Sequence, residues 1–337
     1  MTCPSGRLRI RPPEPIRDAL TAAADAHGYP HRGRHREMRS AIVEYLRTRW
    51  GGAVSIEDAS VLPVIGLKEF VALLVSQLGF GPGARVALPA LAYPTYAVGA
   101  IIAGADWETA DAPPDELSAV PSVVWINSPA NPSGRMLTPP DQLREWVAYC
   151  REHDVILASD ECYGEFGWEA ETVSILHPPD ISGGDYRNIL AAFSLSKRSN
   201  LAGYRAGFVA GDPELIHELT EVRKHSGFML PTPVQAAIAV ALRDQRDVQV
   251  QRERYLRRRT PLRAALEGVG FRIEHSEGGL YLWATRDESC WASVDWLAER
   301  GILVSPGAFY GAAGANFVRV ALTATDERIE AAVSRLG

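Results

Sequence analysis

Residues 189–211 read ILAAFSLSKRSNLAGYRAGFVAG, a polar segment with one lysine between two short apolar runs. Neither run, ILAAF (189–193) nor AGFVAG (206–211), alternates with polar residues, which is typical of strands buried on both faces of a sheet. Four similar runs precede them: VLPVIG (61–66), RVALP (85–89), SVVWIN (122–127) and VILAS (155–159). Amphipathic segments of helix length, such as 67–79 and 139–152, alternate with these runs. This order predicts an α/β fold with a mostly parallel sheet and helices on both faces.

A second, smaller α+β unit is predicted in the C-terminal part of the chain. A long charged helix, from about 248 to 267, precedes short strands at 271–275, 279–284 and 316–322, with helices at 291–300 and 325–335. The helix at roughly 14–27 precedes the large sheet without belonging to its alternation, and we expect it to pack with this unit. Because 337 residues exceed one ordinary core, we predict a large domain over 36–247 and a small domain made of 1–35 and 248–337.

Composition excludes several classes of function. The formal net charge of −6 gives no electrostatic attraction to nucleic acid or anionic lipid. No apolar run approaches the roughly 18 residues of a membrane span, and the N-terminal stretch does not resemble a secretory signal. The four cysteines lack C-x-x-C spacing, and His31 and His35 lack a third ligand, so neither a disulfide framework nor a metal site is predicted. We expect a cytoplasmic protein without nucleic-acid or membrane partners.

Lys197, in the quoted stretch, permits two interpretations. One is a lysine at a strand end, beside serines that form a turn. The other is a lysine that forms a Schiff base with the aldehyde of pyridoxal phosphate, while serine hydroxyls and Arg205 bind the phosphate. Burial and nearby positive charge lower the pKa of a lysine and leave a nucleophilic amine, and arginine matches phosphate oxygens in pairs. The glycine and arginine at fixed later offsets favour the second interpretation.

Polar residues upstream are consistent with the same chemistry, although each also has a simpler explanation. Asp160 follows the strand VILAS, where a carboxylate can pair with a pyridine nitrogen or cap a helix. Asn131, in N-P-S-G, either donates to the phenolic oxygen of the cofactor or forms a turn. Gly66-Leu67-Lys68 marks a strand-to-helix junction whose free N–H groups can hold a phosphate. Tyr93 stacks on the cofactor ring or belongs to the core.

The segment SLSKRSNLAGYRAG resembles the lysine signature of the fold-type-I pyridoxal-phosphate aminotransferases of class I/II, and the resemblance covers nearly the whole chain. It implies a seven-stranded large domain that binds pyridoxal 5'-phosphate and a smaller α+β domain. It also implies that Lys197 is the Schiff-base lysine and that Asp160 pairs with the pyridine nitrogen. The remaining cofactor ligands that it implies are Asn131 and Tyr163 at the phenolic oxygen, Ser194, Arg205 and the backbone at Gly66, Leu67 and Lys68 at the phosphate, and Tyr93 against the ring.

The resemblance also implies substrates and a partner. Arg319, in FVRVAL, matches the arginine that binds the α-carboxylate of amino and keto acids. Tyr29, in GYPHRG, matches a tyrosine that reaches the phosphate of the neighbouring subunit, which implies a homodimer with shared active sites. Side-chain specificity remains open: a distal carboxylate can meet Arg198, Arg223, Lys224 or His225, but each can equally be a surface charge. We interpret RYLRRR (254–259) as a solvated helix face rather than a phosphate-binding patch.

Five stretches resemble the actinobacterial N-succinyldiaminopimelate aminotransferases of lysine and cell-wall precursor synthesis. They are LAYPTYAVGA (91–100), SDECYGEFGWE (159–169), SLSKRSNLAGYRAGFVAGDP (194–213), RKHSGFMLPTPVQAA (223–237) and HSEGGLYLWATR (275–286). This implies glutamate/2-oxoglutarate and N-succinyl-2-amino-6-ketopimelate as the substrate pair. Two departures stand against it. The chain begins near Pro13, where the family usually has a preceding segment, and Leu67 replaces a common hydroxyl residue, which removes a hydrogen bond worth about 1–2 kcal/mol. They motivate an alternative, an enzyme of specialised metabolism that diverts the same carbanion to elimination, replacement or cyclisation.

Overall fold

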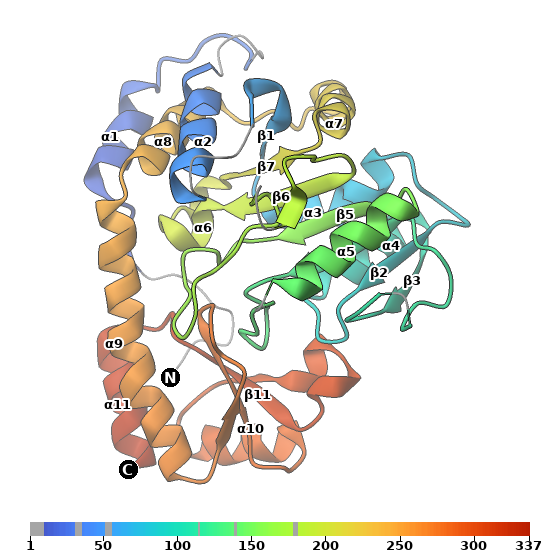
Figure 1. Cartoon of the computed structure of the whole chain (residues 1–337). Coiled ribbons are helices and arrows are strands. Elements are labelled where there is room, and N and C mark those ends of the chain that lie inside the picture. Colours follow the sequence, from blue (N-terminus) through green and yellow to red (C-terminus); the bar gives the residue numbers. More distant parts are fainter. Residues whose placement is uncertain (1–9, 31–35, 51–55, 114, 138–139, 178–180) are drawn as a thin grey trace.

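The computed structural model describes residues 10–30, 36–50, 56–113, 115–137, 140–177 and 181–337, which form two sheets with their helices (Figure 1). The large sheet has seven strands, in the order β1 (Val61–Val64), β7 (Gly207–Gly211), β6 (Ile189–Ser194), β5 (Ile156–Asp160), β4 (Val123–Asn127), β2 (Arg85–Leu88) and β3 (Asp106–Thr109). Neighbouring strands from β6 to β3 run parallel, whereas β7 is antiparallel to both β6 and β1. The predicted mostly parallel α/β sheet is confirmed.

Helices cover both faces of this sheet. One face packs against α2 (Arg36–Arg49), α5 (Asp141–Glu152) and α8 (Thr232–Arg243). The other packs against α3 (Leu67–Gln77), α4 (Thr95–Ala103) and α7 (Pro213–His225). Successive strand residues alternate between these cores, so that Val124 faces α5 while Trp125 faces α3 and α4. Because both faces are covered, the central strands can be apolar throughout.

The register of the central strands brings polar residues together at one edge of the sheet. Asn127, the last residue of β4, lies opposite Asp160, the last residue of β5. Ser194 ends the next strand, β6, and the short helix α6 (Leu195–Arg198) follows at once. Carboxyl ends of parallel strands are where open α/β sheets bind ligands.

The C-terminal unit has its own sheet and core. Its strands follow the order β10 (Ser305–Pro306), β11 (Phe317–Ala321), β9 (Tyr281–Thr285) and β8 (Arg272–Glu274), and all pairs are antiparallel. Apolar side chains of α9 (Arg246–Gly268), α10 (Cys290–Glu299) and α11 (Asp326–Leu336) bury one face of this sheet. Tyr163 and Phe166, from the loop after β5, join the same core and tie the unit to the large sheet.

The N-terminal helix lies elsewhere than expected. Helix α1 (Glu14–Ala22) packs against α8, and Ile16 is buried in the core of the large sheet. The expectation that this helix packs with the C-terminal unit is therefore wrong, because its apolar stripe meets a large-domain helix. The division of the chain at residues 35 and 247 stays a prediction.

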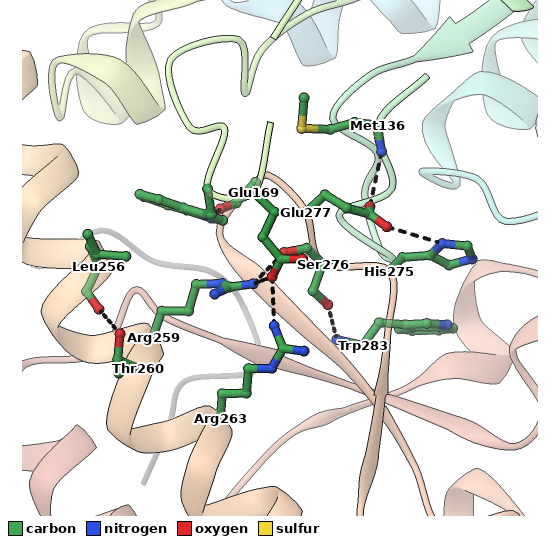
Figure 2. A network of polar contacts seen from close by, with 12 residues as sticks. Met136, Glu169, Leu256, Arg259, Thr260, Arg263, His275, Ser276, Glu277 and Trp283 are labelled. Carbon is green, nitrogen blue, oxygen red and sulfur yellow. Dashed lines mark hydrogen bonds and ion pairs between the residues drawn. The ribbon is translucent and has the colours of Figure 1, made fainter. Parts of the chain in front are cut away.

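A turn between β8 and β9 connects the C-terminal unit to the loop that carries Asn131 (Figure 2). The backbone N–H groups of Ser276 and Gly278 donate to the carbonyls of Ser133 and Gly134, at 3.0 and 2.9 Å. The backbone N–H of Met136 donates to Glu277 Oε2 at 3.3 Å. A Cβ on Gly134 would lie 2.5 Å from the carbonyl oxygen of Gly278, so this close approach requires glycine.

Two of the four arginines of RYLRRR are not on the predicted solvated face, whereas Arg257 is exposed. Arg259 is 7% exposed, forms an ion pair with Glu169 and donates to the Ser276 carbonyl at 2.9 Å (Figure 2). Arg258 is 5% exposed and lies 2.6 Å from Asp326 of α11. The solvated-face interpretation is therefore wrong for these two residues, because their long side chains cross the core to reach carboxylates on neighbouring segments. Within the described part of the chain, no helix combines the length and apolar character of a membrane span.

Candidate active site

A cavity of about 410 Å³ lies at the carboxyl edge of the large sheet, where the C-terminal unit closes over it. Its wall contains most of the residues singled out from the sequence. These are Leu67, Lys68, Tyr93, Asn131, Asp160, Tyr163, Ser194, Lys197, Arg205 and Arg319. They come from seven separate segments of the chain, so the fold brings together groups that the sequence keeps far apart.

One end of the cavity is suited to an anion. Helix α3 begins at Leu67 without a side-chain cap, which leaves its first N–H groups available. Gly66 has a φ of 74° and a ψ of 152°, and a Cβ there would lie 2.8 Å from Cζ of Arg205. Glycine thus lets the guanidinium approach the helix terminus. The Leu67 side chain borders the cavity and packs into the core beneath it.

Lys197 is presented by the short helix α6. Ser194, in the extended region, caps this helix by accepting a hydrogen bond from the Ser196 N–H at 3.2 Å. The neighbouring Arg198 is 4% exposed and points the other way, where its Nε lies 2.9 Å from Glu165 Oε1. It also donates to the Ala241 carbonyl at 2.6 Å. Arg198 therefore anchors the turn from beneath, while Lys197 lies in the cavity wall.

Asp160 is a buried carboxylate with two donors already in place. Its Oδ2 accepts from the Tyr96 hydroxyl at 2.9 Å, and its Oδ1 accepts from the Cys162 N–H at 3.1 Å. Burial raises the pKa of Asp160, and these hydrogen bonds partly oppose the shift. Sequence reasoning missed Tyr96. The spacing Y-P-T-Y offered a signal, because it places Tyr96 in the first turn of α4, three residues after Tyr93.

The opposite wall holds Arg319 in a fixed position. Its Nη1 donates to Oδ1 of Asn131 at 2.6 Å. Its Cζ lies 4.1 Å from the ring centroid of Tyr281 and 4.9 Å from that of Tyr310. Two aromatic faces and one amide oxygen thus hold a guanidinium that is 7% exposed. Sequence reasoning missed both tyrosines, because an aromatic residue on a strand, such as Tyr281, or in a short 3-10 turn, such as Tyr310, looks like core.

A chain of amide contacts links this wall to Asp160. The Asn131 N–H donates to Oδ1 of Asn127 at 2.8 Å. Nδ2 of Asn127 donates in turn to the carbonyl of Asp160, also at 2.8 Å. Asn127, which also lines the cavity, therefore fixes the two predicted ligands relative to each other, and it is a fourth residue that sequence reasoning did not single out.

Other predicted residues lie outside the cavity. Gly66 borders it next to Arg205, whereas Tyr29 is 83% exposed on this chain. Of the candidates for a distal carboxylate, Arg198 anchors α6 and Arg223 is fully buried 2.7 Å from Glu69. Lys224 and His225 are exposed beside Glu221. None of the four lines the cavity, because their helices place them elsewhere.

Among the residues that the structure describes, no group of three or more His, Cys, Asp or Glu side chains could hold a metal ion. His31 and His35 lie outside those residues. The cavity does offer an amine, a buried carboxylate, an arginine beside a helix N-terminus, and amide and phenol donors. This set matches an aldehyde, a pyridine nitrogen, a phosphate and a phenolic oxygen, so the residues present fit pyridoxal 5'-phosphate.

Comparison with known proteins gives the family. The class I and II aminotransferase model matches residues 5–336, and the chain belongs to this family of pyridoxal-phosphate enzymes. The chain is 54% identical to 4-dedimethylamino-4-oxo-anhydrotetracycline transaminase OxyQ of Streptomyces rimosus, over 96% of this chain and 89% of that one. It is 52% identical to a probable aminotransferase of Mycobacterium tuberculosis, over 95% and 76%. The structure of a probable N-succinyldiaminopimelate aminotransferase from Thermus thermophilus superposes with a TM-score of 0.86 at 28% identity, over 98% and 92%.

Proposed function

We propose that this aminotransferase moves the amino group of glutamate, through bound pyridoxal phosphate, to a second keto substrate. The observation that carries the proposal is the shared cavity of Lys197, Asp160 and Arg319. An amine, an acid and a carboxylate-binding guanidinium are the three groups that transamination needs from the protein.

We assign a role to each residue on this basis. Pyridoxal phosphate, when bound, supplies the electron sink for a carbanion. The amine of Lys197 takes the proton from the α-carbon and later returns it. Asp160 keeps the pyridine nitrogen protonated, and Arg205, Ser194 and the start of α3 hold the phosphate.

Arg319 pairs with the α-carboxylate in this proposal and fixes which bond of the α-carbon faces Lys197, an orientation effect. Its contact with Asn131 supports the assignment, because that hydrogen bond fixes the guanidinium in the cavity wall. Asn131 and Tyr163 are assigned to the phenolic oxygen, and Tyr93 to the ring face.

For the second substrate we propose N-succinyl-2-amino-6-ketopimelate or a related keto acid, in lysine biosynthesis. The subfamily stretches in the sequence support it, as does the similarity to the probable N-succinyldiaminopimelate aminotransferase of Thermus thermophilus. A ring ketone is a second candidate, favoured by the name of the Streptomyces rimosus relative. Aromatic side chains on the cavity wall, Phe309 and Tyr310 among them, suit a flat substrate.

One spectroscopic experiment tests both the proposed transamination and the identity of the second substrate. The holoenzyme is mixed with glutamate, and the visible cofactor band is followed. Its conversion to the amine form supports transamination, and no conversion with any amino donor contradicts it. The aminated enzyme is then offered 2-oxoglutarate, N-succinyl-2-amino-6-ketopimelate and a polycyclic ketone separately. Recovery of the band identifies the acceptor, whereas release of ammonia or a replaced side chain would favour elimination or replacement chemistry.

We also propose a homodimer with shared active sites, in which Tyr29 serves the neighbouring subunit. The 83% exposure of Tyr29 supports this, since a large aromatic ring contributes little stabilisation when it is exposed to solvent. Mixed dimers of Lys197→Ala and Tyr29→Ala chains test it. If Tyr29 acts across the interface, each mixed dimer contains one intact site and activity returns. If it acts within its own chain, mixing restores nothing.

A further inference from the structure

Two buried phenols meet at the boundary between the large sheet and the C-terminal unit. The hydroxyl oxygens of Tyr163 and Tyr281 are 2.8 Å apart, and both side chains are 3% exposed. Tyr163 comes from the loop after β5, whereas Tyr281 begins β9. Their rings meet edge to face, with centroids 5.7 Å apart. The contact therefore joins an assigned cofactor ligand to one of the tyrosines that hold Arg319.

The same Tyr281 ring lies against Arg319. Tyr281 and Arg319 are on adjacent strands, because Arg319 pairs with Trp283 and Ala321 pairs with Tyr281, which places both side chains on one face. The guanidinium carbon is 4.1 Å from the ring centroid. Guanidinium groups donate hydrogen bonds but accept none, so Arg319 cannot receive the hydrogen of the Tyr281 hydroxyl.

We propose that Tyr281 is a positioning residue that donates its hydroxyl hydrogen to Tyr163 and so strengthens the hydrogen bond from Tyr163 to the cofactor's phenolic oxygen. This inference rests on the proposed function, because it needs pyridoxal phosphate in the cavity. When the Tyr163 hydroxyl donates its hydrogen bond to the phenolic oxygen, the lone pairs of the Tyr163 oxygen can accept a hydrogen bond from Tyr281. Chains of hydrogen bonds polarise one another, so a donor to the Tyr163 oxygen strengthens the hydrogen bond that Tyr163 itself donates.

The protonation state of Tyr163 allows it to donate to the cofactor. Burial raises the pKa of Tyr163 well above its usual value, so its phenol keeps its hydrogen in the working pH range. A stronger donor at the phenolic oxygen favours negative charge there and makes the neighbouring imine proton easier to lose. Tyr281 should therefore lower the pH at which the bound cofactor's visible band titrates.

We call this chain of hydrogen bonds, from Tyr281 through Tyr163 to the phenolic oxygen, the relay. Tyr281→Phe tests it because the substitution removes one hydroxyl and keeps the ring beside Arg319. Tyr310→Phe is the matched control, since Tyr310 also faces Arg319, at 4.9 Å, but its hydroxyl is not the one that contacts Tyr163. Each variant is loaded with pyridoxal phosphate, and the visible absorption is recorded from pH 5 to 10. We expect the Tyr281→Phe midpoint to rise by roughly 0.2 to 0.4 of a pH unit, as for a cooperative neighbour worth about a fifth of a charge-assisted hydrogen bond. The Tyr310→Phe midpoint should stay unchanged.

A double variant shows whether the effect passes through Tyr163. In a Tyr163→Phe background, Tyr281→Phe should add no further shift. An unchanged or lowered midpoint in the single variant, or an equal shift in both backgrounds, would overturn the relay. The titration needs bound cofactor but no turnover. Failure of the wild type to convert with any amino donor, together with the expected shift, would overturn the proposed function and leave the relay standing.

Discussion

Replacing Gly66 by alanine should damage cofactor binding more than it damages the fold. At a φ of 74° and a ψ of 152°, Gly66 occupies a region of backbone space that is nearly exclusive to glycine. A Cβ at this position would lie 2.8 Å from Cζ of Arg205, and the nearest atoms that it meets all belong to that guanidinium. The substitution therefore strains the backbone and displaces the assigned phosphate ligand together.

The two effects have different sizes and different assays. Backbone strain of this kind costs about 1–3 kcal/mol of folding free energy. A displaced guanidinium loses charge-assisted hydrogen bonds worth about 1.5–3 kcal/mol, which converts to a roughly 10- to 150-fold rise in the dissociation constant of pyridoxal phosphate. Titration of the apoprotein with pyridoxal phosphate gives the dissociation constant, and urea unfolding of the apoprotein gives the stability.

Gly79→Ala is the control that separates the effect of backbone strain from the effect of contact with the Arg205 guanidinium. Gly79 also has a positive φ, of 78°, but a Cβ there would meet nothing within 4 Å. We expect it to lose stability by about 1–2 kcal/mol and to bind pyridoxal phosphate like the wild type. The reasoning would be refuted if Gly66→Ala bound the cofactor as tightly as Gly79→Ala does.

Three further predictions concern the carboxylate site, a buried acid and a buried ion pair. Arg319→Lys should raise the KM for glutamate at least tenfold, because an ammonium cannot reproduce the paired N–H donors of a planar guanidinium. An unchanged KM would exclude Arg319 from substrate binding. Burial raises the pKa of Glu161 from 4.5 to about 7, so the unfolding free energy should fall as pH rises from 5 to 8. Glu161→Gln should flatten this fall by about 2 kcal/mol in urea titrations; parallel curves would contradict it. Arg223→Met should cost about 3 kcal/mol of stability by leaving Glu69 uncompensated, whereas the exposed Lys224→Met should cost nothing measurable by urea unfolding.

The sign of the Glu161 prediction follows from proton binding. Between pH 4.5 and 7 the folded carboxyl keeps a proton that the unfolded chain has released. Its contribution to stability is therefore complete below pH 4.5 and disappears as the pH rises through 7. Oε2 of Glu161 has no hydrogen-bond partner within the part of the chain that the structure describes, which is consistent with a costly charge there.

The large sheet could be predicted from the sequence because burial on both faces leaves apolar runs. Strand β4, SVVWIN in the sequence, is buried at every position and was found on that pattern. Strand β3 (Asp106–Thr109) was missed, because an edge strand of sequence DWET is mostly exposed and carries no apolar run. Strand β10 has only two residues, too few to show a period. Helix α4 was missed for the opposite reason, since it is apolar nearly all round.

The site was predictable where a motif follows a strand and unpredictable where contacts are tertiary. Lys197 and Asp160 each follow a recognisable buried strand, so their chain position predicted their place at the sheet edge. The donor to Asp160 comes from Tyr96, 64 residues away, and only the packed structure reveals it. Arg258 and Arg259 were misread because sequence shows a run of charges but not the carboxylates that face them.

The large sheet and the C-terminal unit contribute different groups to the cavity. The groups assigned to pyridoxal phosphate come from the large sheet, whereas the groups around the carboxylate side, Tyr281, Phe309, Tyr310 and Arg319, all come from the C-terminal unit. Hydrogen bonds between the 275–279 turn and the Asn131 loop fix one unit against the other. Phe309 and Tyr310 belong to the aromatic wall and have no assigned part in cofactor binding, so substitutions there can change the second substrate with little effect on the cofactor. Tyr281 and Arg319 differ, because they also contact the assigned cofactor ligands Tyr163 and Asn131.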